Sequence, residues 1–165
     1  MSLETIFLQS AIKRVLTYKE LGDKTLMLLS DGELHFSPNE ESNNIAVLVQ
    51  HMAGNMLSRW TDFLTTDGEK SSRERDMEFI DQHLNKQALL DLWNSGWNCF
   101  LQALHQLNGD DLLRSITIRG ESLLVVDAIN RQLTHYPHHV GQIIYIAKII
   151  KNTSWKSLSI PKKKV

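Results

Sequence analysis

Apolar residues recur along most of this chain at spacings of three and four, the period of amphipathic helices. Between residues 3 and 29 they stand among charged residues at helix-like spacing, which predicts a first helix. A turn signal at residues 30–32 and a loop near Pro38 follow. Asn43 or Asn44 then caps a second helix, expected over about residues 45–64.

The apolar spacing stops after the second helix. Residues 65–76 are polar and charged, so we expect a surface loop with no buried face. From about residue 86 to residue 107 the apolar positions return to spacings of three, four and seven, which predicts a third helix. Asn108 and Gly109 form its stop signal.

A short period-two pattern interrupts the helices between residues 113 and 119. Ile116 and Ile118 alternate there with polar residues, as in a half-buried strand, and Gly120 then turns the chain. Ser122 is a plausible cap for a final helix over about residues 123–151.

Four long helices with little strand bury their apolar faces most simply around a common axis. The pattern therefore predicts an all-α four-helix bundle with a short strand or hairpin before the last helix. We expect one domain over residues 1–158 and a basic tail over residues 159–165.

Composition narrows the class of protein further. A net charge of −1 provides no field to attract nucleic acid or anionic lipid. No secretory leader and no apolar segment of about 18 residues is evident, so secretion and membrane spanning are not expected. The single cysteine, Cys99, cannot form an intramolecular disulfide; it fits a reducing cytoplasm and is interpreted as a buried, inert thiol.

Polar residues form a stripe on the otherwise apolar second helix. Its members share one helical face: Asn44, His51, Asn55, Ser58 and Asp62. A second polar stripe runs down the last helix through Arg131, His135, His139 and Gln142. If the two stripes face each other, they line a cleft.

Histidines on these stripes suggest a metal site. His135 and His139 lie one turn apart and can share an ion, and His51 would complete a facial set from the second helix. Neutral imidazole suits zinc, nickel, copper and iron, and a three-histidine site leaves positions for water or substrate. The alternative is that these are hydrogen-bonded core histidines with no metal.

Other residues near the stripes have secondary roles in this hypothesis. Asn55, Arg59 and Gln142 are candidates for orienting a small-molecule substrate, and Asn55 or Gln142 for holding a histidine tautomer. Arg59, beside Trp60 and Asp62, fits at least as well in a structural ion pair that anchors the loop after the second helix. Pro137 removes a backbone donor between the paired histidines and is expected to kink the helix.

The remaining histidines are not expected in the site. His138 points about 100° away from His139 on a regular helix. His35, His83 and His105 have loop or exposed helical contexts and are predicted at the surface.

Two motifs resemble a known family. The segment IAVLVQHMAGN and the closing HYPHHVGQI, with its H-x-x-x-H followed closely by Gly-Gln, are similar to the DinB-like (YfiT-like) superfamily of bacterial metal-binding four-helix bundles. The stretch NMLSRWTDFLTTDGEK resembles a branch of that superfamily whose members carry a domain of unknown function. The resemblance covers nearly the whole chain and assigns His51, His135 and His139 as the metal ligands.

The resemblance also implies a divalent metal, often zinc or nickel, a cytoplasmic setting and frequently a homodimer. Relatives include transferases that use low-molecular-weight thiols such as bacillithiol or mycothiol. Two hypotheses follow: a metal-dependent thiol transferase or hydrolase acting on a small molecule, or a non-catalytic dimeric interaction module stabilised by the metal. Nucleic-acid binding, suggested only by the history of the family name, is disfavoured by the neutral net charge.

Overall fold

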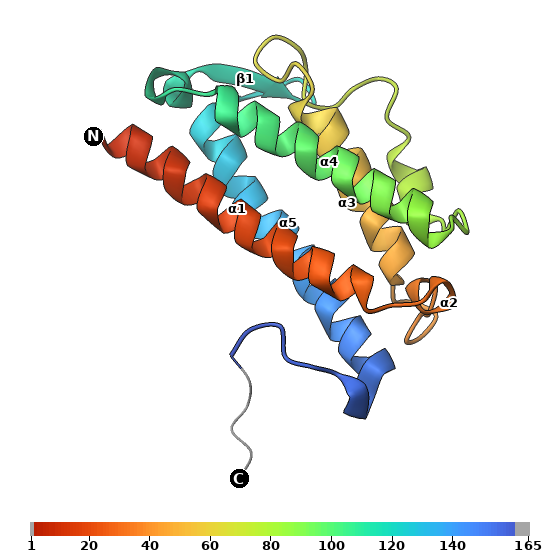
Figure 1. The fold of residues 1–165 in the computed structure, drawn as a ribbon. Helices are drawn as coiled ribbons and strands as arrows, with labels where there is room; N and C mark the ends of the chain where they lie inside the picture. Colours follow the sequence, from red (N-terminus) through yellow and green to blue (C-terminus); the bar gives the residue numbers. More distant parts are fainter. Residues whose placement is uncertain (1, 161–165) are drawn as a thin grey trace.

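The computed structural model describes residues 2–160 and is mostly helical, with a two-stranded hairpin before the last helix (Figure 1). The predicted fold class is confirmed. Its helices are α1 (Leu3–Met27), α2 (Asp31–Leu34), α3 (Ile45–Trp60), α4 (Lys86–Gln106) and α5 (Val125–Lys151). Short 3-10 turns are η1 (Arg75–Phe79), η2 (Gly109–Leu113) and η3 (Asn152–Ser154), and the strands are β1 (Ser115–Ile118) and β2 (Glu121–Leu124).

The four long helices enclose one core. α1 packs against α4 and α5, and α3 packs against the same two helices from the other side. Large side chains from α4 and α5 fill the centre, among them Trp93, Trp97 and Phe100, with Tyr136 opposite them. Trp93 and Trp97 are therefore core residues. This packing brings the polar faces of α3 and α5 to one side of the bundle.

Asparagine side chains begin two of the long helices. Asn44 accepts a hydrogen bond from the backbone N–H of Val47, and Asn85 does the same for Ala88, each replacing a partner that the first turn lacks. α3 ends at Trp60, four residues before the expected end. Thr61 takes an extended backbone there, and Asp62 adopts a positive φ of 47°, so the helical path stops.

The hairpin corrects one expectation. Ser122 does not cap the last helix, because it lies in β2 opposite Thr117 of β1. α5 begins only at Val125, after Leu124 at its N-cap position. Arg119 and Gly120 form the turn with φ values of 57° and 75°, which is the two-residue geometry that matches the twist of a hairpin.

The polar segment 65–76 also departs from expectation. It is a loop, but it folds back on the bundle and buries the side chain of Arg73, which is 4% exposed. Asp67 fastens it to the hairpin by accepting hydrogen bonds from the backbone N–H groups of Arg119 and Gly120, at 2.9 and 2.8 Å. The prediction of a loop without a buried face was wrong because Arg73 finds carboxylate partners that the local pattern does not reveal.

Within residues 2–160, none of the helices has the length and apolar character needed to cross a bilayer. Of the basic tail predicted over residues 159–165, residues 161–165, with their three lysines, lie outside the described part of the chain.

Candidate metal centre

Three imidazoles from two helices converge at one point. His51 projects from α3, and His135 and His139 project from successive turns of α5. Nε2 of His135 lies 3.4 Å from Nε2 of His51 and 3.0 Å from Nε2 of His139. The sequence analysis named these three residues, and together they form a cluster that could hold a metal ion.

The spacing of these nitrogens fits one shared ion. Nitrogens at about 2.0–2.1 Å from a single zinc stand roughly 2.8–3.4 Å apart at octahedral to tetrahedral angles. The His51–His135 and His135–His139 separations of 3.4 and 3.0 Å fall in that interval. Two of the three separations therefore match a shared ion, and all three ligand atoms lie within 4.8 Å of one another.

The other nitrogen of each ring faces an acceptor. Nδ1 of His51 lies 3.0 Å from a carboxylate oxygen of Glu78, and Nδ1 of His139 lies 2.7 Å from Oε1 of Gln142. Nδ1 of His135 lies 3.3 Å from Oε1 of Gln132. These acceptors favour the tautomer in which each ring donates from Nδ1 and keeps the lone pair on Nε2, directed toward the cluster.

Glu78 belongs to a network that the sequence analysis missed. It lies in η1, and both of its oxygens accept hydrogen bonds from Arg73, each at 2.7 Å. Arg73 also donates to Glu69 at 3.1 Å. Burial opposes ionisation of Glu78, yet the hydrogen bonds from Arg73 and His51 outweigh it and hold the pKa of Glu78 below its ordinary value. Because Glu78 follows a polar loop with many other charged residues, its local sequence does not indicate that it would contact His51 and Arg73.

Burial also favours the neutral form of His135 and His139. It lowers the pKa of His135 to about 3, with the neighbouring His139 and His51 adding to the effect. Burial lowers the pKa of His139 as well, against a hydrogen bond to Gln142 that acts in the opposite direction. Neutral imidazole is the form that binds a metal ion, so no proton has to be displaced from His135 or His139 near neutral pH.

Pro137 does not separate the two histidines of α5. The helix continues through it from Val125 to Lys151, and the paired Nε2 atoms stay within 3.0 Å. His138, between them, is exposed and outside the cluster, as its helical position predicted.

Comparison with protein families adds one decisive match. Residues 2–164 match the model of a family described as a protein of unknown function, DUF1572. The chain belongs to the DUF1572 family. A comparison with curated proteins found no match.

Two of the residues expected to orient a substrate line a cavity next to the histidine cluster of this DUF1572 protein. Asn55 and Arg59 share its wall with His51 and His135. Gln142 does not line this cavity; it is exposed and contacts His139 instead.

Asn55 is held by the core and not by a histidine. Its Oδ1 accepts a hydrogen bond from the hydroxyl of Tyr136 at 2.9 Å, and that hydroxyl accepts one from the indole N–H of Trp60 at 3.2 Å. Burial raises the pKa of Tyr136, so the hydroxyl stays neutral and can donate. These two hydrogen bonds link α3 to α5 next to the histidine cluster, because Tyr136 adjoins His135.

The nearest carboxylate to Arg59 belongs to Glu69, with 3.6 Å between Nη2 and the carboxylate oxygen. Glu69 lies in the loop after α3, which is the loop that the alternative interpretation of Arg59 as a structural ion-pair residue had it anchor, whereas Asp62 is exposed. Nε and Nη1 of Arg59 have no hydrogen-bond partner among the described residues.

A second group of ligand-type side chains lies beside the N-terminus of α3, where Asn44 donates a hydrogen bond to Asp81. His35, Asp81 and His83 come together there, so His35 is half-buried and not at the surface as predicted. Both ring nitrogens of His35 face acceptors, Asp81 at 2.7 Å and the carbonyl of Leu84 at 3.0 Å. Both ring nitrogens of His35 are engaged in these contacts and the side chain of His83 is 84% exposed, so we interpret this group as holding the end of α2 against the segment before α4.

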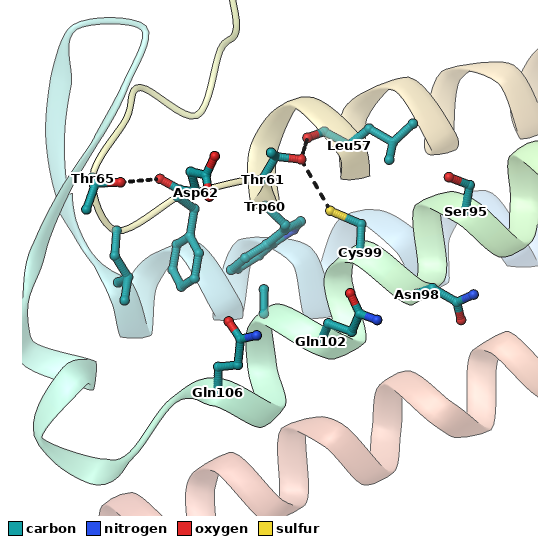
Figure 2. A pocket seen from close by; sticks show the side chains of 13 residues that line it. Leu57, Trp60, Thr61, Asp62, Thr65, Ser95, Asn98, Cys99, Gln102 and Gln106 are labelled. Carbon is teal, nitrogen blue, oxygen red and sulfur yellow. Dashed lines mark hydrogen bonds between the residues drawn. The ribbon is translucent and has the colours of Figure 1, made fainter.

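A separate depression of about 650 Å³ lies between the C-terminal end of α3 and α4 (Figure 2). Cys99 lines it and is half-buried, so it is less enclosed than predicted. Its thiol contacts the hydroxyl of Thr61 at 3.5 Å. The amides of Asn98, Gln102 and Gln106 line the α4 side, and no basic group that would activate a thiol is among the lining residues.

Proposed function

We propose that this protein is a DinB-like metalloprotein in which His51, His135 and His139 bind one divalent ion, zinc or nickel. The observation that carries the proposal is the convergence of three Nε2 lone pairs, each set by an acceptor at Nδ1 of the same ring. Three lone pairs at separations of 3.0 and 3.4 Å repel one another unless a cation or a proton lies between them. Burial disfavours the proton at His135 and His139.

The proposed activity is that of a metal-dependent thiol transferase or hydrolase acting on a small molecule. A bound divalent ion lowers the pKa of a thiol or water that it coordinates and so supplies a nucleophile at neutral pH. The protein contributes a cavity that opens directly onto His51 and His135, where a substrate can approach. A low-molecular-weight thiol is the proposed co-substrate for the transferase.

The alternative is a metal-stabilised interaction module without catalysis. One observation favours it: the three ligands come from α3 and α5, so the ion would fasten two helices of the bundle. We further propose that the protein is a cytoplasmic homodimer that binds no nucleic acid. Light scattering and a mobility-shift assay at low salt test the dimer and the last point.

Metal content tests the site itself. Mass spectrometry of the untagged parent chain is expected to find about one equivalent of metal, with a large loss in His51→Ala and His135→Ala. His105→Ala is the matched control, because His105 is exposed on α4, its Nδ1 contacts the carbonyl of Leu101, and it lies outside the histidine cluster. A parent protein that stays metal-free after incubation with zinc or nickel would overturn the proposal.

Chelation separates the two functions. A structural metal adds to the folding free energy, so its removal should lower stability by several kcal/mol. A catalytic metal on a self-sufficient bundle should leave stability almost unchanged while abolishing thiol transfer or hydrolysis. Urea unfolding with and without chelator measures the difference.

A further inference from the structure

The cavity beside the histidine cluster is unusually rich in arginine. It has a volume of about 530 Å³ and reaches the cluster through His51 and His135. Five guanidinium groups line it: Arg59, Arg73, Arg75, Arg119 and Arg131. They come from α3, the loop after it, η1, the hairpin turn and α5, so only the folded chain gathers them.

The buried guanidinium group of Arg59 lacks hydrogen-bond acceptors among the described residues. Its side chain is 3% exposed, yet it makes no hydrogen bond within the described residues, and Nε and Nη1 are both unpartnered. Burial lowers the pKa of Arg59, and Glu69 offsets this only in part from 3.6 Å. A buried charged donor without a partner is costly and indicates that an acceptor belongs beside it.

Charge pairing in the cavity is also uneven. Arg73 is matched by Glu78 and Glu69, and Arg119 reaches Glu69 at 3.3 Å. Arg131 on α5 is exposed, and among the described residues no carboxylate lies within ion-pair distance of it. Glu69 is thus shared by three guanidinium groups, those of Arg59, Arg73 and Arg119, while Arg131 has no such partner, so net positive charge remains on the wall that adjoins the histidines.

We infer that this cavity binds the anionic group, a carboxylate or a phosphate, of the small molecule on which the protein acts. Arg59 and Arg131 hold the anion by charge-assisted hydrogen bonds, the strong class for this pairing. The rest of the molecule then reaches the histidine cluster on the same wall, which orients its reacting group. This inference names the substrate class of the proposed function and rests on it for the reaction, while the anion site itself needs no metal.

Titration of the full chain with inorganic phosphate and with succinate tests the inference by calorimetry, on chelator-treated and on zinc-loaded protein. We expect one of the two anions to bind the metal-free protein, and Arg131→Gln to weaken that binding by about tenfold. Arg14→Gln removes the same charge from an exposed position on α1 outside the cavity and should leave binding unchanged. Tighter phosphate binding assigns a phosphoryl group, and tighter succinate binding assigns a carboxylate.

Arg59→Gln is the second variant, with helicity checked by circular dichroism. Because Arg59 is buried, a misfolded variant leaves the test to Arg131→Gln, which changes an exposed side chain. If neither anion binds the metal-free parent protein, the inference is overturned, and ordered water is then the hydrogen-bond partner of Arg59. Equal weakening by Arg14→Gln and Arg131→Gln would also overturn it, because the effect would then be general charge attraction.

The outcomes distinguish this inference from the proposed function. Anion binding without any uptake of zinc retains the arginine site and removes the metal proposal. Zinc uptake with anion binding only to the loaded protein, unaffected by Arg131→Gln, retains the metal site and removes the arginine site, because the anion would then be a metal ligand.

Discussion

The carboxylate of Glu78 lies 3.0 Å from Nδ1 of His51 and joins that histidine to the buried Arg73. An acceptor at Nδ1 orients a ligand imidazole and makes its other nitrogen a better donor to a metal. The histidine cluster therefore depends on a loop residue that is not itself a ligand.

Replacing this carboxylate should weaken metal binding. In Glu78→Gln the charge beside His51 is lost and Arg73 keeps only Glu69 as an anionic partner, so zinc affinity should fall by about 10- to 100-fold. Competition with a chromophoric chelator measures this affinity. Glu121→Gln, at an exposed position on β2, is the control and should bind zinc like the parent. Unchanged affinity in Glu78→Gln would mean that Glu78 serves only to neutralise Arg73.

Gly54 offers a way to move Glu78 without removing it. A Cβ at this position of α3 would collide with Oε1 of Glu78, so Gly54→Ala should push the carboxylate away from His51 and lower zinc affinity. Gly141→Ala is the matched control, because a Cβ there meets no atom within 4 Å. That control should keep its zinc affinity and gain about 0.5–1 kcal/mol in stability, the usual advantage of alanine over glycine in a helix. Parental zinc affinity in Gly54→Ala would contradict this account.

The hydroxyl of Tyr136 should matter for stability. Tyr136→Phe leaves the Trp60 N–H and the Asn55 oxygen without their partner in the core, and an unsatisfied buried group costs about 1–3 kcal/mol. Urea unfolding followed by tryptophan fluorescence measures the loss. Tyr145→Phe is the control. Tyr145 is 66% exposed, so this change should alter the free energy of unfolding by less than about 0.5 kcal/mol. Equal stability of the two variants would show that water replaces the lost hydroxyl.

An ion pair between α2 and the end of α5 should make stability depend on pH. Glu33 contacts Lys151 at 2.7 Å, and chiefly that hydrogen bond lowers the pKa of Glu33 from 4.5 to about 2. A lowered pKa in the folded state stabilises the protein above about pH 4.5, and this contribution is lost as the pH falls toward 2. Glu33→Gln should therefore cost about 0.5–1 kcal/mol at pH 7, a value limited by solvent screening.

Urea unfolding at pH 7 and pH 3 checks this prediction. The difference between the parent and Glu33→Gln should shrink by roughly half by pH 3, because the carboxyl of the unfolded chain is then protonated while that of the folded protein is still mostly ionised. Glu40→Gln, exposed in the loop before α3, is the control and should match the parent at both pH values. A difference between parent and Glu33→Gln that does not change with pH would show that the Lys151 contact contributes no electrostatic stability.

Local pattern was sufficient for most of the fold. The three- and four-residue spacing predicted α4 over residues 86–107, and the structure has it from Lys86 to Gln106. The same reasoning predicted that the last helix begins at residue 123, two residues before its observed start at Val125. Residues 121–124 form β2 only because they pair with β1, and that pairing depends on the hairpin turn, not on the apolar spacing of the segment.

The helical period also determines that His135 and His139 share one face of α5, because residues four apart lie one turn above each other. The approach of His51, the hydrogen bond from Glu78 and the gathering of the arginines depend on packing between segments. Glu78 stands 27 residues after His51, and Arg131 and Arg59 belong to different helices. Short-range periodicity constrains neighbours within a turn or two, whereas contacts at this separation form only when the helices pack and the loop between them closes, so the tertiary structure alone decided them.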